Sequence, residues 1–309
     1  MHKFIFNILY LLIILFSKAE NSFSEPSITP SLFNADTQLV WVMVNVNTEK
    51  GQGDAHLLIS RSGKVLLIDT GDSNQAENIL LPFLISHKIQ FIDQILITHP
   101  HYDHYGGLEP LLKNNNIKID SIFMGPVSEE LCKIEYWGCF RDQLNQIETL
   151  ATAKGVLIQD YSKWSKFVFD DHSVFKKLYQ FDEKTTPLKS TDINDLSLIG
   201  MLYHGKSKAL FTGDLNQTLS EWLVEHASSE IKADILKVPH HGAEGMATDR
   251  FLLAVSAKTF LVPGTKKIWE SERSKRLRNL ANINRIQTYV NGLQGNVIVR
   301  FTKDTFSVS

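Results

Sequence analysis

The chain has 309 residues, of which 43% are hydrophobic and 21% are charged, and its formal net charge at pH 7 is −2. This composition is typical of a globular protein with ample material for a core, and it excludes a collagen-like or an intrinsically disordered chain. The balanced charge also excludes a general attraction to nucleic acid, so binding of a polyanion would need a local cluster of basic side chains.

The N-terminal residues have the pattern of an export signal. Lys3 precedes an almost unbroken apolar segment at residues 4–16, and small residues offer a cleavage site after Ala19. The apolar segment, about 13 residues long, is short for a membrane-spanning helix, which needs roughly 20 residues. We therefore predict a signal peptide at residues 1–19 and a periplasmic or secreted protein, with an uncleaved membrane anchor as the alternative. We expect no transmembrane channel in this chain.

The Ser- and Pro-containing residues 20–35 are predicted to be a linker, and residues 36–309 a single domain. Apolar runs rich in β-branched residues predict strands at residues 39–46, 56–60, 64–68, 92–97, 117–124, 196–203, 207–212, 234–238, 287–290 and 296–301. The last two strands are expected to close a second sheet. Helices are predicted at residues 74–88, 108–113, 128–154 and 216–226, and residues 155–180 are predicted to form short strands whose aromatic side chains pack in the core.

The densest group of metal-ligating side chains follows the strand at residues 92–97. His99, His101, Asp103 and His104 occupy six consecutive positions, and two glycines come directly after Tyr105. His99 and His101 alternate as on an extended chain and point the same way, whereas Asp103 and His104 follow where the chain turns. Neutral imidazoles with a carboxylate suit Zn²⁺, with Mn²⁺ or Fe²⁺ as alternatives. We predict that this loop divides its ligands between two adjacent cations.

Further polar residues stand at the ends of other predicted strands. Asp69 ends an apolar strand, where a carboxylate must find partners. We expect it to orient the histidine loop by bonding a ligand or the loop backbone. Asp214 follows the strand at residues 207–212 and suits a ligand shared by two cations. His240 and His241 follow the strand at residues 234–238.

The pattern His-x-His-x-Asp-His at residues 99–104 is the signature of the metallo-β-lactamase superfamily, and the resemblance continues in order along the chain. Residues 66–71 are similar to the strand of this family that ends in Asp-Thr-Gly. Together with residues 51–55, the stretches 210–214 and 236–242 look like the C-terminal hydrolase domain of ComEC-type DNA-uptake proteins. The resemblance runs from about residue 38 to the C-terminus. It implies an αββα four-layer sandwich with two metal ions at the edge between the sheets.

The resemblance also implies a role for each candidate ligand. One cation would be held by His99, His101 and Asp214. The second would be held by Asp103, His104, Asp214 and one residue of the pair His240 and His241. The other histidine of that pair would face the substrate as a proton donor or a phosphate contact, and the sequence does not decide between the two.

The resemblance also implies that three more residues lie near these ligands. Asn194 occupies a position where many family members have another histidine, although ComEC-like proteins commonly have asparagine, so one cation would have only three protein ligands. Gln52 and Asp54 lie in a region that is near the mouth of the metal site in the family. Asp54 is a candidate for supporting a ligand, but it fits the role of a turn residue equally well.

The C-terminal part departs from the family pattern. Ala243 replaces the usual serine after His-His-Gly, and residues 264–269 replace an Asn-x-Tyr-x-His-Pro-like segment. The same region is basic, which indicates either a solvated helix face or a patch that attracts phosphates. The basic residues are Lys266, Lys267, Arg273, Lys275, Arg276, Arg278 and Arg285. The candidate phosphate contacts are Lys237, Lys266 and Lys267.

The two cysteines, Cys132 and Cys139, are seven residues apart within the helix predicted at residues 128–154. On a continuous helix this separation spans roughly 10 Å, which is too far for a disulfide. A bridge would therefore require a break in the helix, which Gly138 could supply, and an oxidising compartment would favour it. The sequence leaves the state of the two thiols open.

These patterns predict an exported metal-dependent hydrolase, with a phosphodiesterase or nuclease as the leading hypothesis. Two divalent cations, Zn²⁺ first and Mn²⁺ second, would lower the pKa of a water molecule so that it can attack a phosphodiester. The expected catalytic residues are Asp103, His240 and His241. The substrate would be nucleic acid or a smaller phosphodiester. Hydrolysis of a β-lactam or lactone is one alternative, and a non-enzymatic module that binds nucleic acid or an envelope partner is another. No protein partner is predicted.

Overall fold

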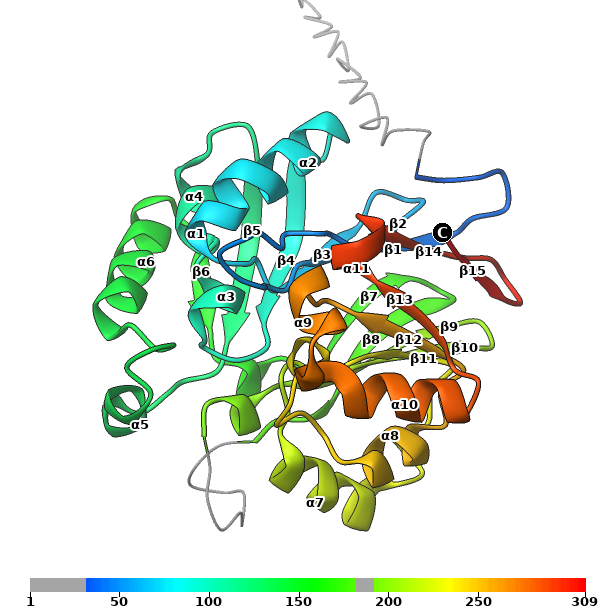
Figure 1. Cartoon of the computed structure of the whole chain (residues 1–309). Helices are drawn as coiled ribbons and strands as arrows, with labels where there is room; N and C mark the ends of the chain where they lie inside the picture. Colours follow the sequence, from blue (N-terminus) through cyan, green and yellow to red (C-terminus); the bar gives the residue numbers. More distant parts are fainter. Residues whose placement is uncertain (1–31, 182–191) are drawn as a thin grey trace, which may run out of the picture.

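The computed structural model describes residues 32–181 and 192–309 (Figure 1). The predicted signal peptide and most of the predicted linker lie outside the described residues. The last linker residues already belong to the fold, because Leu32 is buried and its carbonyl oxygen accepts a 2.9 Å hydrogen bond from Nε of Arg300. None of the helices in the two described ranges is both long enough and apolar enough to span a membrane.

The described residues form two β-sheets that face each other. The first has eight strands in the order β15-β14-β1-β2-β3-β4-β5-β6, and the second has seven in the order β13-β12-β11-β10-β9-β8-β7. The first sheet contains β1 (Leu39–Met43), β2 (His56–Ser60), β3 (Val65–Ile68), β4 (Phe91–Ile97), β5 (Lys118–Met124), β6 (Leu157–Gln159), β14 (Val297–Phe301) and β15 (Phe306–Val308). The second contains β7 (Lys166–Asp170), β8 (Ser173–Tyr179), β9 (Ile199–His204), β10 (Ser207–Phe211), β11 (Ile235–Lys237), β12 (Thr259–Val262) and β13 (Gln287–Val290).

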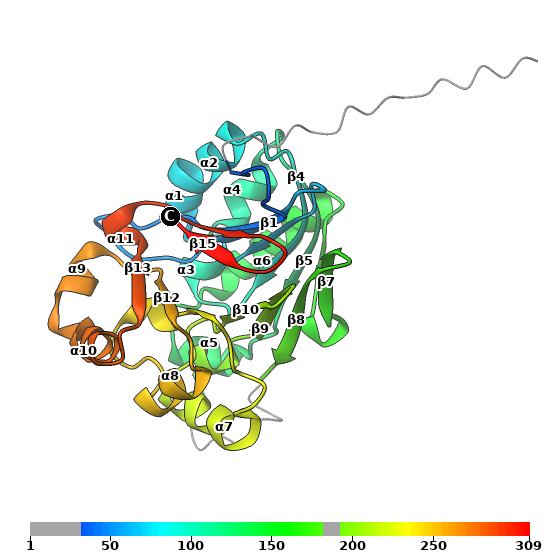
Figure 2. The same cartoon turned by 90° about the vertical axis from the view of Figure 1, so that its right-hand side faces the viewer.

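Helices cover the outer face of each sheet (Figures 1 and 2). The helices of the first half are α1 (Ser73–Gln75), which continues through a π-turn at Ala76–Leu80 into α2 (Leu81–Ser86), and then α3 (Tyr102–Tyr105), α4 (Leu108–Lys113), α5 (Glu129–Ile134) and α6 (Arg141–Ala153). The helices of the second half are α7 (Gln217–Ala227), α8 (Asp249–Val255), α9 (Lys266–Glu270), α10 (Lys275–Ile283) and α11 (Asn291–Gln294). The predicted αββα four-layer sandwich is confirmed.

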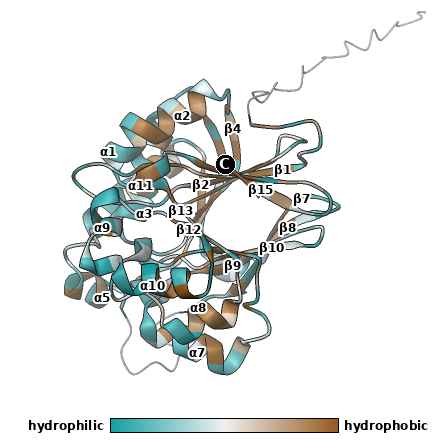
Figure 3. Cartoon of the chain, turned by 45° about the vertical axis from the view of Figure 1, so that its right-hand side comes forward, coloured by the Kyte–Doolittle hydropathy of each residue, from teal (hydrophilic) through white to brown (hydrophobic). Residues whose placement is uncertain are grey.

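The period-two pattern of the strands explains the layers. In β1 every residue is buried, but alternate side chains enter different cores. Val40 and Val42 pack under the helices of the first half, whereas Trp41 packs between the two sheets against Phe211, with ring centroids 4.3 Å apart. The strands are accordingly mainly hydrophobic in Figure 3, and hydrophilic residues lie on the outer helices. Burial on both faces fixes the register, because a shift by one residue would exchange the two sets of side chains.

The parallel parts of both sheets place polar loops at one edge. β3, β4 and β5 run parallel in the first sheet, and β10, β11 and β12 run parallel in the second. Asp69 follows β3, and the histidine loop follows β4. In the second sheet Asp214 follows β10, and His241 follows β11. Because the carboxyl ends of parallel strands meet at the same edge, residues far apart in sequence come together there.

Two expectations about the fold were wrong. The strand at Val297–Phe301 does not close the second sheet, because β14 pairs antiparallel with β1 of the first sheet. Alternating apolar residues specify a half-buried strand but not its partner, and Gly295, with a φ of 80°, allows the chain to turn toward the first sheet. The helix predicted at residues 128–154 is broken into α5 and α6. In addition, α8, β12, α11 and β15 were not anticipated.

Candidate metal centre

The histidine loop is held by tight contacts with the loop that follows β3. The amide of Thr70 donates to the carbonyl oxygen of His104 at 2.8 Å, and the amide of Gly107 donates to that of Gly71 at 2.9 Å. A Cβ atom at position 107 would lie 2.3 Å from the carbonyl oxygen of Thr70, so only glycine permits this approach. The two loops therefore form one unit at the edge of the first sheet.

One set of candidate ligands is formed by Asp103, His104, Asp214 and His241. Nε2 of His241 lies 3.1 Å from a carboxylate oxygen of Asp103 and 3.1 Å from one of Asp214. Nε2 of His104 lies 3.3 Å from the same oxygen of Asp214 and 3.9 Å from Asp103. These residues come from both sheets, so the set exists only when the sandwich is assembled.

A second set adjoins the first and shares His104 and Asp214 with it. Ligand atoms of His99, His104 and Asp214 lie within 4.8 Å of one another. Nδ1 of His101 lies 3.2 Å from Nε2 of His99, so the two imidazoles of the His-x-His pair face each other with one nitrogen each. Asn194 is buried, and its Oδ1 has no hydrogen-bond partner among the described residues.

The hydrogen bonds of the four histidines leave one nitrogen of each ring free to bind a cation. Nδ1 of His104 donates to the carboxylate of Asp69 at 2.9 Å, and Nε2 of His101 donates to Glu135 at 2.8 Å, because a carboxylate only accepts. The remaining two histidines follow the same rule. Nδ1 of His99 lies 3.1 Å from Oγ1 of Thr98, whose own proton goes to Asp69, and Nδ1 of His241 lies 3.0 Å from the carbonyl oxygen of Pro263.

This arrangement fits divalent cations. Nε2 of His104 is buried without a hydrogen bond among the described residues and faces carboxylate oxygens. Imidazole nitrogens with carboxylates are ligands that Zn²⁺ and related metals prefer. A bond from the second ring nitrogen to a carboxylate or carbonyl is the usual support of a metal-bound histidine. The metallo-β-lactamase fold binds divalent metals, often two, and these residues would hold them.

In the protein without metal, buried carboxylates raise the pKa values of two candidate ligands. Burial opposes the charged form of His104, but the carboxylates of Asp214, Asp69 and Asp103 outweigh it and hold the pKa of this imidazole well above its usual value. Burial likewise opposes a charge on His241, yet nearby carboxylates, above all Asp214, raise its pKa well above normal. An excess of buried negative charge therefore needs positive partners, which protons or cations can supply.

Asp69 occupies the position that its predicted orienting role requires. Its carboxylate accepts from the amide of Thr98 at 2.7 Å, from Oγ1 of Thr98 at 2.8 Å and from His104 at 2.9 Å. The backbone of Asp69 has a φ of 60°, a left-handed conformation that costs on the order of 1 kcal/mol outside glycine. Such a conformation is retained where surrounding contacts fix it, as they do here.

Asp54 and Lys237 form a buried ion pair beneath the ligands. The ammonium group of Lys237 contacts the carboxylate of Asp54, lies 3.3 Å from Asp214 and donates to the carbonyl oxygen of Gly213 at 2.7 Å. Asp54 is fully buried, and its Oδ1 also lies 3.1 Å from Nδ1 of His241, so it supports this ligand on the side away from Asp103 and Asp214. Lys237 was predicted as a phosphate contact. Its buried ammonium faces these acceptors, and this geometry does not fit that role.

The two consecutive histidines have different surroundings. His241 is buried and points at Asp103 and Asp214. His240 is partly exposed, and its buried Nδ1 has no hydrogen-bond partner within the described ranges. Both residues have positive φ values, 50° for His240 and 54° for His241. The structure therefore brings His241 into the ligand set and leaves His240 outside it.

Lys266 and Lys267 lie at the edge of a groove of about 970 Å³ between α9 and the loop at residues 45–52. Lys50 and Arg273 line the same groove. Other members of the basic segment have structural partners instead. Arg276 bonds Asp249 and the carbonyl oxygens of residues 246 and 247, and Arg278 bonds the carbonyl oxygens of residues 269 and 271.

Sequence reasoning missed Glu135 and the carbonyl oxygen of Pro263. Glu135 is 4% exposed, although it stands among exposed residues between two cysteines. A charged residue on the buried side of a helix end was the only available signal. Nothing in the local pattern indicated its partner, which lies 34 positions earlier in the chain.

The comparisons with known proteins agree with the geometry. A family model described as the metallo-beta-lactamase superfamily matches residues 48–122. ComE operon protein 3 of Bacillus subtilis is 29% identical over 233 residues, which cover 70% of this chain and 27% of that protein. Competence protein ComA of Neisseria gonorrhoeae is 25% identical over 208 residues, which cover 67% of this chain and 25% of that protein. The chain thus spans roughly a quarter of the length of these two relatives.

A solved structure shows the same fold. CmlA, a diiron beta-hydroxylase from Streptomyces venezuelae, is 12% identical and has a TM-score of 0.50 over 87% of this chain and 55% of that chain. The likeness concerns the fold alone. The chain therefore has the metallo-β-lactamase fold, its residues 48–122 match the model of that superfamily, and its sequence is similar to part of bacterial competence proteins.

Proposed function

We propose that this protein is a metal-dependent phosphodiesterase whose substrates include nucleic acid. The observation that carries the proposal is the meeting of two ligand sets at His104 and Asp214. A nearby groove, which reaches Gln52, is lined by four basic residues and by Glu49 and Glu270. The similarity in sequence to competence proteins and the resemblance to ComEC-type hydrolase domains support the same chemistry. A hydrolase of uncharged lactones would have no need of the four basic residues in the groove.

The groove and the ligand sets are joined through the chain itself. Gln52 lines one wall, and Asp54 beneath the ligands is only two residues further on, with its amide bonded to the carbonyl oxygen of Asp103 at 3.2 Å. On the other wall, Thr265 is the residue immediately before α9. It follows the segment at residues 263–264, which contacts His241. A polyanion lying in the groove would therefore run toward the ligands.

The basic side chains suit this path. The described residues place no carboxylate within ion-pair distance of Lys267 or Arg273, whereas Lys266 has Glu270 at 3.9 Å. Phosphate contacts of this kind fix the position of a nucleic acid without reading its sequence. They provide locally the attraction that the net charge of −2 does not provide.

The ligand residues and their neighbours would have different roles in the reaction. When bound, two divalent cations, Zn²⁺ or Mn²⁺, would lower the pKa of a water molecule toward neutrality and neutralise charge on the phosphoryl group. Asp103 is the most exposed of the clustered carboxylates, with 31% of its side chain accessible, so it can orient a water molecule on the open side. In this proposal His240, which precedes His241 in the chain, contacts a phosphoryl oxygen or the leaving oxygen.

We also propose that the protein acts outside the cytoplasm, in the periplasm or after secretion. Two observations support export: the signal-peptide pattern at residues 1–19, and the disulfide between Cys132 and Cys139. Structural disulfides persist in oxidising compartments and are rare in the cytosol. Mass spectrometry of the protein from cell fractions would test this, with a mature N-terminus at position 20 expected and a cytosolic protein with residues 1–19 retained as the opposing result.

Cleavage assays test the activity. Metal-loaded protein without residues 1–19 would be incubated with single-stranded DNA, double-stranded DNA and bis-p-nitrophenyl phosphate, in Mn²⁺ and in Zn²⁺. We expect cleavage that is lost in Asp103→Ala and by chelation. Cleavage of the small ester alone would restrict the proposal to a small-molecule phosphodiesterase. No cleavage of any of these substrates by protein that contains metal would refute it.

A further inference from the structure

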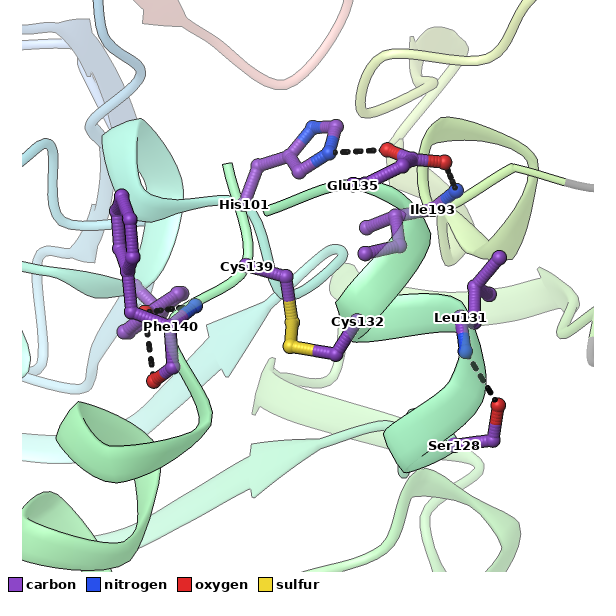
Figure 4. Close-up of a disulfide and its surroundings, with 9 residues drawn as sticks. His101, Ser128, Leu131, Cys132, Glu135, Cys139, Phe140 and Ile193 are labelled. Carbon is purple, nitrogen blue, oxygen red and sulfur yellow. Dashed lines mark hydrogen bonds and ion pairs between the residues drawn. A yellow bond between two sulfur atoms is a disulfide. The ribbon is translucent and has the colours of Figure 1, made fainter. Parts of the chain in front are cut away.

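The stretch between the two cysteines forms a closed loop against the histidine loop (Figure 4). Helix α5 ends at Ile134, and Glu135 leaves the helical conformation with φ and ψ of −103° and 48°. The chain then turns, so that the amides of Gly138 and Cys139 both donate to the carbonyl oxygen of Glu135, at 3.0 and 2.9 Å. The turn brings Cys132 and Cys139 to a Cα–Cα distance of 5.1 Å, where a disulfide joins them.

The carboxylate of Glu135 is shared between two donors. One oxygen accepts from Nε2 of His101 at 2.8 Å, and the other accepts from the amide of Ile193 at 2.8 Å (Figure 4). Glu135 is 4% exposed, so both bonds are shielded from water. Because the proton of His101 is thereby held on Nε2, its Nδ1 is left without a proton and faces His99.

The same loop contacts the histidine loop at two further points. The carbonyl oxygen of Gly138 accepts from the amide of Tyr102 at 2.9 Å. The Cα of Gly138 also packs on the imidazole of His101 so closely that an added Cβ would lie 2.7 Å from Cδ2 of that ring. The ring is therefore fixed at its edge by Gly138 and at its Nε2 by Glu135.

We propose that Glu135 is a positioning residue for the cation held by His99 and His101, and that the Cys132–Cys139 disulfide keeps it in place. His101 differs from the other three histidines in one respect. The supports of the other three directly follow strands, whereas Glu135 follows helix α5, so the orientation of His101 depends on how firmly the loop after α5 is closed. The disulfide joins the two ends of the turn at whose start Glu135 stands. The proposal rests on the metal site described above but not on the identity of the substrate.

Glu135→Gln is the informative substitution because it keeps the size of the side chain. The carboxylate accepts two hydrogen bonds, whereas glutamine has one acceptor and would direct its amide N–H at a second donor. Removal of such a supporting group typically weakens metal binding about 10- to 100-fold. Glu130→Gln is the matched control, since Glu130 is exposed on the same helix.

The first experiment titrates metal-free protein with Zn²⁺ in the presence of a chelating indicator. We expect Glu135→Gln to weaken one binding equivalent about 10- to 100-fold and to leave the equivalent held by His104 and His241 within about threefold. Glu130→Gln should bind as the unaltered protein does. Equal isotherms for Glu135→Gln and Glu130→Gln would overturn the proposal, whether the protein takes up one equivalent or two.

The role of the disulfide is tested by combining variants. Replacing both cysteines with serine should weaken the same binding equivalent, and adding Glu135→Gln to that variant should cause little further loss. This lack of additivity is expected because the disulfide acts through Glu135. Effects that multiply would show that the two act independently and would overturn this part of the proposal. Gly138→Ala, which displaces the ring without altering any charge or cysteine, should weaken the same equivalent.

A second measurement needs neither metal nor substrate. The ¹⁵N chemical shifts of His101 in the metal-free protein report which ring nitrogen carries the proton. We expect a single tautomer with the proton on Nε2, and a mixture of tautomers in Glu135→Gln. The shifts of His104, which is supported by Asp69, should stay unchanged. A His101 tautomer that does not respond to the substitution would refute the positioning role even if metal binding changed through altered folding.

Discussion

Nδ1 of His104 donates a 2.9 Å hydrogen bond to Asp69, which stands 35 positions earlier in the chain. The same carboxylate holds the amide and the hydroxyl group of Thr98, and the hydroxyl group in turn contacts Nδ1 of His99. One carboxylate thus determines the proton positions of two candidate ligands from different ligand sets. Its loss should affect both cations.

Asp69→Asn should lower metal content and stability together. The substitution retains one acceptor for three donors, and asparagine tolerates the positive φ at this position, so backbone strain is not the cause. We expect both equivalents to bind about 10- to 100-fold more weakly and the free energy of unfolding to fall by about 1–3 kcal/mol. Metal analysis and urea unfolding would measure the two effects.

Asp93→Asn provides the control for this change. Asp93 is also buried, and it accepts from the amide of Val65 at 2.8 Å and from Lys64 at 2.7 Å, but it does not contact the histidine loop. Its substitution should reduce stability without reducing metal content. Equal metal content in the two variants would contradict the role assigned to Asp69.

Lys237→Met should strongly destabilise the metal-free protein. The substitution leaves Asp54 and Asp214 buried without their shared cation, and breaking a buried pair costs about 3–5 kcal/mol. Bound metal would compensate Asp214 but not Asp54, so metal should restore only part of the loss. Urea unfolding with and without Zn²⁺ would measure this. The control is Lys208→Met, at an exposed lysine of β10, which should change the free energy of unfolding by no more than about 0.5 kcal/mol. A similarly small effect of Lys237→Met would argue against the ion pair.

The stability of the metal-free protein should fall as the pH rises above the usual range of histidine. The pKa values of His104 and His241 are raised well above normal in the folded state, so their charged forms stabilise the fold fully below about pH 6.5, the unfolded value. This contribution is lost as the pH rises through the folded pKa values. Burial first, and then the neighbouring histidines, lowers the pKa of His99 well below normal, so His99 adds no change in this window.

Metal affinity should rise over the same window, because a cation binds the neutral imidazoles and displaces their protons. Urea unfolding of metal-free protein at a series of pH values, together with Zn²⁺ titrations in buffers of different ionisation enthalpy, would measure stability and proton release. In His104→Gln the dependence of stability on pH should become shallower. A metal-free protein that grows more stable as the pH rises above about 6.5 would contradict these pKa shifts.

His240→Ala and His241→Ala should have different consequences. His241→Ala removes a nitrogen that faces Asp103 and Asp214, so metal content should fall. His240→Ala should leave metal content unchanged and reduce cleavage, since His240 contacts none of the clustered ligands by an ion pair. Metal analysis with a bis-p-nitrophenyl phosphate assay separates the two. A loss of metal in His240→Ala would reassign the ligand.

Lys267→Ala should weaken the cleavage of DNA more than the cleavage of bis-p-nitrophenyl phosphate. Lys267 lines the groove, and each lost phosphate contact should reduce the slope of log affinity against log salt by about one. Lys275→Ala is the matched control, because it removes the same charge from an exposed lysine that pairs with Glu272 and does not line the groove. If both variants bind DNA with the same salt dependence, the groove does not guide the substrate.

Much of the fold and of the site could be predicted because the signals are local. The ligands His99, His101, Asp103 and His104 stand within six positions after a buried strand, so their spacing alone indicates a metal loop. The individual strands could be predicted for the same reason, since their hydrophobic pattern lies within short stretches. The four-layer sandwich was predicted from the resemblance of the ordered motifs to a known family. Asp69 and Asp214 could be identified because each ends an apolar run.

Only the tertiary structure decided which distant residues support these ligands. Glu135 meets His101, Lys237 turns inward to Asp54 rather than outward to a phosphate, and β14 joins β1 across almost the whole length of the chain. Hydrophobic periodicity states that a side chain is buried but not what it meets, because partners are chosen by packing between elements that are far apart in sequence. The sequence by itself therefore determined the candidate metal ligands of the histidine loop, and the assembled sandwich determined their orientation and their charge balance.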